Sequence, residues 1–150
     1  MRVSGVARVR LSPCGRTLAV VPQERKGHLE LRDVDSGRLL ASRRVDGRAV
    51  MDLAFSPDGR WLATGGWKVL RTWHPRSAAP GMVTPEGTLP VYRVAFGAGV
   101  LLALDSHLRV WDLEGRPLAS IPANPDSQAP LSISRTAGWR CPGATTRAEP

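Results

Sequence analysis

The chain of 150 residues is long enough for one domain, and its hydrophobic content of 42% suffices for a buried core. No apolar run approaches the roughly 18 residues that a membrane-spanning helix needs, and residues 1–5 show no secretory signal. The formal net charge is +8, with 19 arginines among the 21 basic residues. This balance fits anionic partners and a compositional bias equally well, and it does not define a fold.

The two cysteines, Cys14 and Cys141, lie in a predicted turn and in the C-terminal region. Two unpaired thiols are typical of a protein in a reducing compartment. Because no secretory signal is visible either, we expect a cytoplasmic protein.

Short apolar runs separated by turn residues predict β-strands over residues 6–121, and no helical period competes with them. The strands form three units of four, at 6–43, 50–84 and 91–121. In the first unit they are expected at 6–11, 17–21, 28–33 and 39–43. In the second they are expected at 50–55, 61–64 and 69–73, with a weak fourth strand at 82–84 after the turn-rich run 75–81. In the third they are expected at 91–96, 100–104, 108–111 and 118–121.

The second unit contains a turn whose residues explain its shape. Pro57 fixes φ at the second position of the turn, Asp58 can accept a hydrogen bond from its own backbone, and Gly59 tolerates positive φ. Together with Ser56 they predict a tight connection between the first and second strands.

Two landmarks of the chain recur at nearly the same period. The turn at Ser56 matches one at Ser12, 44 residues earlier, and the strand ending at Phe55 matches one ending at Phe96, 41 residues later. The third strands end on aligned residues spaced by 41 and then 38 positions: Arg32, Trp73 and Trp111. Such self-similarity indicates a repeat architecture in which each unit needs its neighbours to bury its faces.

The character of the sequence changes after residue 121. Five prolines interrupt a stretch of small and polar residues at 122–150, which predicts a disordered tail. One segment, 131–134, is a candidate first strand of a fourth unit, because Ile133 follows Phe96 by 37 residues.

The period and landmarks resemble the WD40 repeats of β-propellers, which recur about every 40–45 residues with a Trp-Asp signature. Trp111-Asp112 is the full dipeptide, whereas the first two units keep half of it, as Arg32-Asp33 and Trp73-His74. Asp105 matches the tight-turn aspartate of the family. Its counterparts, Lys26 and Trp67, do not match, and the usual Gly-His pair is missing from all three units. The family's Asp-His-Ser-Trp network is therefore incomplete here.

The resemblance implies an all-β fold, a partial propeller of about three four-stranded antiparallel blades forming an open ring. The Ser-Pro-Asp-Gly turn also occurs in TolB-like propellers, but Trp111-Asp112 with Asp105 favours the WD40 family. Expected structural motif residues are Ser56, Pro57, Asp58, Gly59, Trp73, Asp105, Trp111 and Asp112.

Propellers typically close with about 4–8 blades, so three blades leave two faces unpaired. Three explanations are open. The chain is a fragment of a longer propeller, which the start inside a repeat and the unpatterned tail favour. A second copy completes a ring of six blades. Another polypeptide supplies the missing blades.

No catalytic, cofactor or metal site is expected. His28, His74 and His107 lack the close spacing of metal ligands. Neither Ser12 nor Ser56 lies in a nucleophile elbow. The glycine pairs near 65 and 97 lack the residues of a phosphate loop. The candidate catalytic carboxylates are explained by their places in the repeat, as turn and strand-end residues: Asp52, Asp58, Asp105 and Asp112.

The resemblance also places the loops at 22–27, 43–48, 65–68 and 105–107 on one rim of the propeller, the rim that commonly binds partners. These loops carry six basic residues: Arg25, Lys26, Arg43, Arg44, Arg48 and Lys68. A basic rim that docks an acidic protein surface or phosphates is one hypothesis, and a solvated charged surface is the other. Trp61 and Trp67 lie next to turns, and either one, if exposed, could anchor a partner.

We therefore expect a non-enzymatic protein–protein interaction scaffold. The alternative is a basic protein that binds nucleic acid through its Arg-rich rim. An enzyme ranks third, because no convergent cluster of carboxylates is visible.

Overall fold

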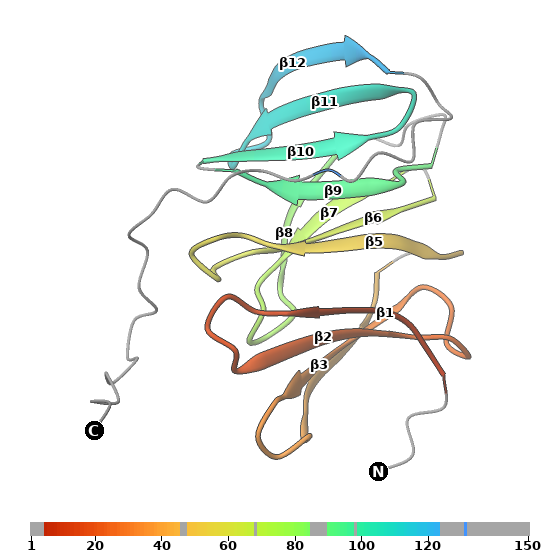
Figure 1. Cartoon of the computed structure of the whole chain (residues 1–150), viewed down its shortest axis with the longest axis vertical. Coiled ribbons are helices and arrows are strands. Elements are labelled where there is room, and N and C mark those ends of the chain that lie inside the picture. The colour runs from red at the N-terminus through yellow and green to blue at the C-terminus, as the bar shows by residue number, and fades with distance from the viewer. Residues whose placement is uncertain are drawn as a thin grey trace.

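The computed structural model describes residues 5–45, 48–67, 69–84, 90–97, 99–123 and 131, and these form twelve strands and no helix (Figure 1). Blade 1 contains β1 (Val6–Leu11), β2 (Thr17–Pro22), β3 (His28–Asp33) and β4 (Leu39–Arg44). Blade 2 contains β5 (Val50–Phe55), β6 (Leu62–Gly66), β7 (Leu70–Trp73) and β8 (Pro80–Val83). Blade 3 contains β9 (Arg93–Phe96), β10 (Val100–Leu104), β11 (His107–Asp112) and β12 (Pro117–Pro122).

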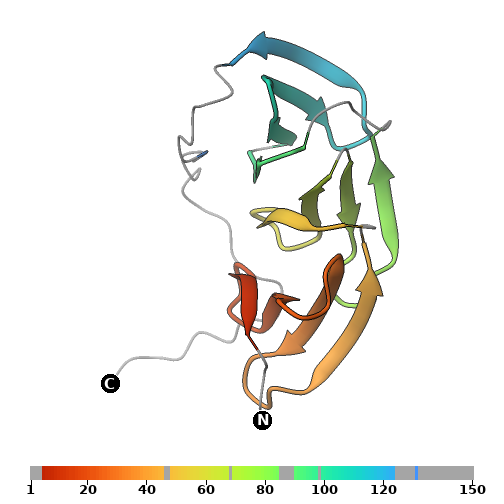
Figure 2. The same cartoon turned by 90° about the vertical axis from the view of Figure 1, so that its right-hand side faces the viewer.

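Each blade is a four-stranded antiparallel meander in which neighbouring strands follow one another along the chain. The first strands of the blades lie side by side, because β5 contacts both β1 and β9. Figure 2 shows the three sheets fanned along an arc, with β4, β8 and β12 on its outer side. The predicted all-β fold of three open four-stranded blades is thus confirmed.

The tight turns after β1 and β5 share one hydrogen-bond pattern. The Ser56 hydroxyl donates to Asp58 Oδ1 over 2.6 Å and accepts from the backbone N–H of Trp61 over 2.9 Å. The Gly59 N–H donates to the Ser56 carbonyl, with φ of 67° at Gly59. In blade 1, Ser12 Oγ likewise accepts the N–H of Thr17.

The two apolar clusters found among the described residues lie between blades. The first joins Leu29 and Leu31 of blade 1 to residues of blade 2, including Trp73. The second joins Ala63 and Leu70 of blade 2 to blade 3, and the Trp111 side chain packs against it. Trp73 and Trp111 occupy the same place in their sheets, since each lies opposite the leucine near the start of the second strand.

Blade 2 keeps one link of the family's Asp-His-Ser-Trp network, the hydrogen bond between the tryptophan and a hydroxyl group. Trp73 Nε1 donates to Thr64 Oγ1 over 2.9 Å within the buried interface. In blade 3 the residue at the position of Thr64 is Ala103, which offers Trp111 no such acceptor. The difference follows from the incomplete motif that the sequence shows.

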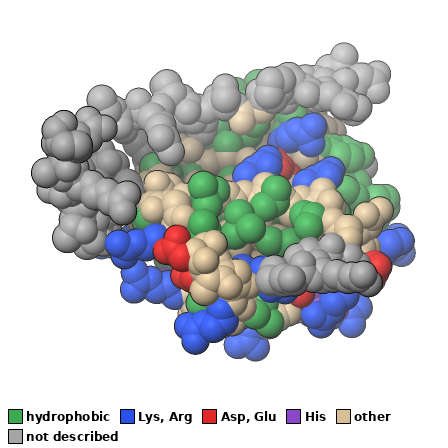
Figure 3. Space-filling view, turned by 60° about the horizontal axis from the view of Figure 1, so that its bottom comes forward, with side chains coloured by type: hydrophobic (Ala, Val, Ile, Leu, Met, Phe, Trp, Pro, Cys, Tyr) green, Lys and Arg blue, Asp and Glu red, His purple; other side chains and the backbone are tan. Residues whose placement is uncertain are grey.

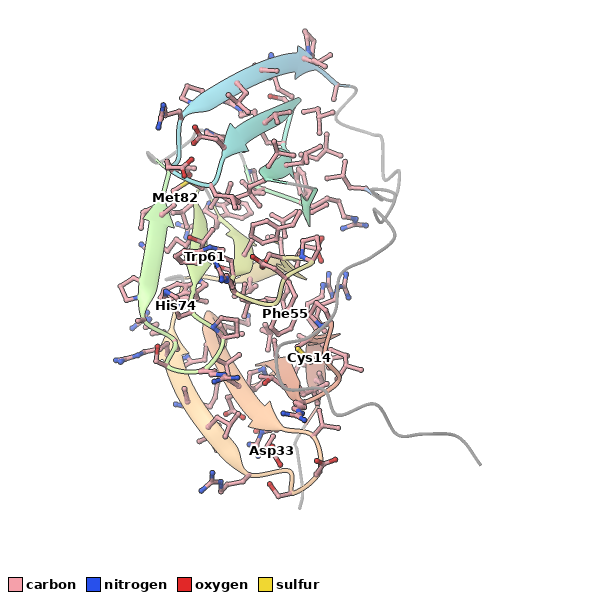
Figure 4. All side chains as sticks on the ribbon, turned by 90° about the vertical axis from the view of Figure 1, so that its left-hand side faces the viewer. Cys14, Asp33, Phe55, Trp61, His74 and Met82 are labelled. Carbon is pink, nitrogen blue, oxygen red and sulfur yellow. The ribbon has the colours of Figure 1, made fainter. Side chains whose placement is uncertain are left out.

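The fourth strand of blade 2 forms earlier in the chain than expected, at Pro80–Val83 instead of 82–84. Pro80 is tolerated because β8 is an outer edge strand, where a missing N–H costs no ladder bond. Gly81 is needed because a Cβ there would lie 2.5 Å from the Trp61 ring. Figure 4 shows Trp61 beside His74, and their ring centroids are 4.5 Å apart.

The second strand of blade 2 is also displaced, to Leu62–Gly66 from the expected 61–64, so its two glycines belong to the strand. A Cβ on Gly65 would lie 2.8 Å from Val91 Cγ1, so the close approach of the next blade requires glycine there. The expected strand at 131–134 and the tail at 122–150 fall mostly outside the described residues, as does Lys68.

The last turn of each blade has its own cap. The Asp33 and Asp112 carboxylates accept backbone N–H groups of Ser36 and Arg116 in blades 1 and 3, and His74 replaces them in blade 2. Positive φ recurs within this turn, at 67°, 50° and 89° for Gly37, Ala78 and Gly115. Blade 2 therefore places a side chain where the other blades have glycine.

Candidate interaction surface

The loops of the stack gather on two opposite rims. The connections that follow β2, β4, β6, β8 and β10 lie on one side, at the right of Figure 1, and we call this side the basic rim. Backbone hydrogen bonds tie neighbouring loops together there, from Val45 N–H to the Gly27 carbonyl and from Val91 N–H to the Gly66 carbonyl. The loop positions are thereby fixed by the sheets beneath them.

The structure places five of the six predicted rim residues on this side, all of them exposed: Arg25, Lys26, Arg43, Arg44 and Arg48. Among the described residues of these loops, the acidic groups are Glu24, which is exposed, and Asp105, which is buried and paired with Arg109 over 3.2 Å. Asp46, Lys68 and Glu86 belong to the same connections but lie outside the described residues.

The opposite rim is balanced in charge. Its turns and adjoining strand ends carry five arginines and five carboxylates: Arg16, Arg38, Arg60, Arg76 and Arg116 with Asp33, Asp35, Asp58, Asp112 and Glu114. Ion pairs neutralise part of this set, as between Arg116 and Asp112 over 3.4 Å. The excess positive charge of the described loops is therefore concentrated on the basic rim.

One residue of the basic rim, Arg25, also forms an ion pair within blade 1. Arg25 lies 3.4 Å from Glu30, a buried carboxylate that also pairs with Arg32 over 2.7 Å. Arg43 and Arg44 end β4, opposite Leu29 and His28 in the ladder. Their charge reaches solvent beside the first loop of the rim.

An aromatic residue lies within this basic surface. Trp67, at the turn between β6 and β7, is 38% exposed, and the Arg48 guanidinium lies 5.5 Å from its ring centroid. Tyr92, also exposed, follows Val91, whose backbone bonds to the residue before Trp67. Sequence reasoning named Trp67 as an anchor if exposed. It missed Tyr92, because only the packing of blade 3 on blade 2 brings the two loops together.

The carboxylates considered for catalysis do not converge. Asp52 accepts hydrogen bonds from Arg10 Nη2 and from the Val94 N–H, over 3.0 and 3.1 Å. Asp105 accepts the N–H of His107 over 2.7 Å, and Asp58 belongs to its turn. Each of these carboxylates thus has a structural partner, within its own turn for Asp58 and Asp105 and on the neighbouring blades for Asp52. Within the described part of the chain, no group of three potential ligands could hold a metal ion.

A hydroxyl group perturbs one carboxylate of the opposite rim. The Ser36 hydroxyl donates to Asp33 Oδ1 over 2.6 Å, and this hydrogen bond, assisted by the Ser36 N–H, lowers the pKa of Asp33 below its usual 3.8. In the same described ranges, no helix has the length and apolar character to cross a membrane.

Four-stranded antiparallel sheets packed face to face along an arc are the blades of a β-propeller. The family model "WD domain, G-beta repeat" matches residues 37–74, which run from the last strand of blade 1 through the third strand of blade 2. Residues 37–74 thus match a WD40 repeat, within a partial propeller of three described blades.

Two solved propellers superpose on most of the chain. The structure titled "Crystal structure of RRP9 WD40 repeats" matches with a TM-score of 0.73 and 19% identity. The match covers 82% of this chain and 40% of the chain in that structure. "Structure of U3-55K" gives the same TM-score and identity, with 41% of that chain covered. These likenesses show the fold.

Two curated relatives match in sequence. The mouse "Guanine nucleotide-binding protein subunit beta-like protein 1" is 32% identical over 87 residues, 55% of this chain and 27% of the relative. The "Pre-rRNA-processing protein IPI3" of Yarrowia lipolytica is 28% identical over 137 residues, 82% of this chain and 32% of the relative. The chain therefore spans about a third or less of the length of each relative.

Proposed function

We propose that the chain is a non-enzymatic interaction module of the cytoplasm whose basic rim docks an acidic surface of a partner protein. The observation that carries this proposal is the difference between the rims. The described loops of one rim present exposed Arg and Lys side chains with little exposed acid, whereas the other rim is balanced. Complementary charge steers encounter and selects partners, so an asymmetric rim favours one docking orientation.

The rim also has the composition of a binding hot spot. Trp and Arg are the residues most enriched among those that dominate interface energies. Trp67 and Arg48 lie together on the basic rim, and the sheets below hold both loops in place. Docking on such a surface requires no chemical step, which agrees with carboxylates that are each tied to a structural partner.

The test compares two triple variants of equal charge. One replaces Arg43, Arg44 and Arg48 with Glu on the basic rim, and the other replaces Arg38, Arg60 and Arg76 with Glu on the opposite rim. Binding of a fluorescent polyglutamate peptide is measured by anisotropy at several salt concentrations. We expect the first variant to bind about tenfold more weakly and the second to match the unmodified protein, since exposed charge pairs contribute about 0.2–1 kcal/mol each. Equal losses in both variants would mean that net charge matters and the rim does not.

A second candidate function is nucleic-acid binding, and the exposed Trp67 ring under Arg48 favours it, because bases stack on aromatic and guanidinium planes. A single-stranded RNA oligonucleotide titrated in the same assay separates the two. If the RNA binds more tightly than the peptide and Trp67→Ala abolishes that binding, the second function replaces the first.

A further inference from the structure

The first strand of blade 1 is exposed where its counterparts are buried. Val9 is 44% exposed, whereas the residues at the same repeat position in blades 2 and 3, Leu53 and Val94, are 1% and 4% exposed. Leu11 is 55% exposed, and its counterpart Phe96 is 7% exposed. Leu53 and Val94 are buried because the preceding blade packs on them. The exposed face of β1 therefore has the character of an interface between blades, and none of the three described blades packs on it.

This free face of blade 1 is apolar at its centre. Alternation along the strands puts Val9 and Leu11 on the side of Leu18 and Val20, their partners in the ladder. Figure 3, which brings the blade 1 end of the molecule forward, shows hydrophobic side chains gathered there with Lys and Arg side chains around them. The face also carries Glu30 and Arg32, which neutralise each other.

The other end of the stack carries a free face of the opposite kind. In blade 3, Leu101 and Ala103 pack toward blade 2, so Leu102, which is half-buried, and Leu104, which is 7% exposed, lie on the opposite side of the sheet. Leu108 and Val110 lie opposite them in the ladder and share that face. Beyond Leu108 in the same sheet, Ile121 is 55% exposed.

The two free faces match in size as well as in polarity. Blade 1 packs on blade 2 through small residues, among them Ala19 and Val21, and blade 3 has Leu102 and Leu104 at those positions. On the receiving side, blade 2 presents Leu53, Phe55 and Trp73, and blade 1 has the smaller or polar Val9, Leu11 and Arg32 at those positions. The larger side chains on the free face of blade 3 would therefore pack against the smaller side chains on the free face of blade 1.

The innermost strands would meet without the ion pair that joins β1 to β5 within the chain. Within the chain, Arg10 of β1 pairs with Asp52 of β5. At the corresponding positions of a junction between blade 3 and a second blade 1, Ala95 would face Arg8. A small apolar residue opposite an arginine leaves that arginine free to reach solvent or a carbonyl, as Arg8 already does by donating to the Met51 carbonyl over 3.0 Å.

We propose that the free face of blade 3 docks on the free face of blade 1 of a second copy, head to tail, and that two such junctions close a ring of six blades. A heterologous contact closes into a ring when its rotation returns to the start. Six blades lie within the range of about 4–8 in which propellers close.

The test measures the solution mass of the purified chain by sedimentation equilibrium from about 1 to 100 μM. We expect a mass close to twice the 16.2 kDa of one chain. Leu11→Glu and Val110→Glu each place a charge in both junctions, and each should weaken association about a hundredfold or more. Val83→Glu is the control matched to Leu11→Glu, because Val83 is 51% exposed against 55% for Leu11 but lies on the outer edge strand of blade 2. It should leave the mass unchanged.

Mixing the two variants provides the decisive arm. A mixed pair keeps one junction in which the intact blade 3 of the Leu11→Glu chain meets the intact blade 1 of the Val110→Glu chain. The mixture should therefore recover a dimer that neither variant forms alone, while circular dichroism shows both variants folded. A monomer at all concentrations, or a dimer that survives Leu11→Glu, would overturn the proposal and leave the free faces to blades of another sequence. The rim variant with Arg43, Arg44 and Arg48 replaced by Glu should still dimerise, so this result is independent of acidic-partner binding.

Discussion

Asp52 connects the innermost strands of all three blades, and its removal should cost more stability than any exposed ion pair. The side chain is buried, with Oδ1 facing Arg10 of β1 and Oδ2 accepting the Val94 N–H of β9. Asp52→Ala leaves that buried N–H without an acceptor, at a cost of about 1–3 kcal/mol. The ion pair adds about 0.2–1 kcal/mol, because the Arg10 side chain is half exposed. We expect a total loss of about 1–4 kcal/mol.

Urea denaturation followed by circular dichroism measures this loss, with Arg10→Met as the matched control. Arg10→Met removes the same ion pair but leaves the Val94 hydrogen bond intact, so it should cost at most about 1 kcal/mol. Amide exchange at Val94 should accelerate in Asp52→Ala and not in Arg10→Met. If both variants lose the same stability, Asp52 acts only through its charge, and the reasoning about the bridge between blades is refuted.

Three further predictions concern the turns and one buried arginine. Gly115→Ala should destabilise the fold by about 1–3 kcal/mol, because φ is 89° at Gly115 and the new Cβ would lie 2.8 Å from the Met82 sulfur. Ala78→Gly should change the stability by less than about 1 kcal/mol. Thermal unfolding of both variants measures the two effects. Arg71→Met should raise the free energy of unfolding by about 1 kcal/mol, because the buried Nε of Arg71 has no hydrogen-bond partner. Urea denaturation measures this change, and a loss of stability would show that the nitrogen is hydrogen-bonded in solution. The pKa of Asp33 is lowered, so its stabilising contribution is present above the unfolded pKa and is lost as the pH falls through the folded one. Ser36→Ala should raise the Asp33 pKa toward 3.8 in an NMR titration, and an unchanged value would exclude the hydroxyl as the cause.

The blade pattern could be predicted because its determinants are local. Ser56 and its neighbours specify a turn within a few residues, and the same turn returns at Ser12. The strands on either side follow from short apolar runs, so their number and order were predictable. The sequence also placed Trp73 and Trp111 at equivalent positions.

Features that depend on packing between blades could not be predicted. Gly65 is required in β6 because a Cβ there would lie 2.8 Å from Val91 Cγ1 of the next blade, and no local pattern encodes that contact. Asp52 was considered as a strand residue and a weak catalytic candidate, and only the stacking of three blades gives it two partners. The unpaired Nε of Arg71, by contrast, has its origin within blade 2. Its counterpart Arg109 pairs with Asp105, and the residue at the position of Asp105 in blade 2 is Trp67.

The location of the two apolar clusters has a consequence for unfolding. Each cluster is shared by two adjacent blades, so blade 2 contributes to both, and each end blade contributes to one. In such a linear array, unfolding of blade 1 or blade 3 breaks one junction between blades, whereas unfolding of blade 2 breaks two. In the unassociated chain, fraying should therefore begin at blades 1 and 3, and the amide protons of β6 should exchange last.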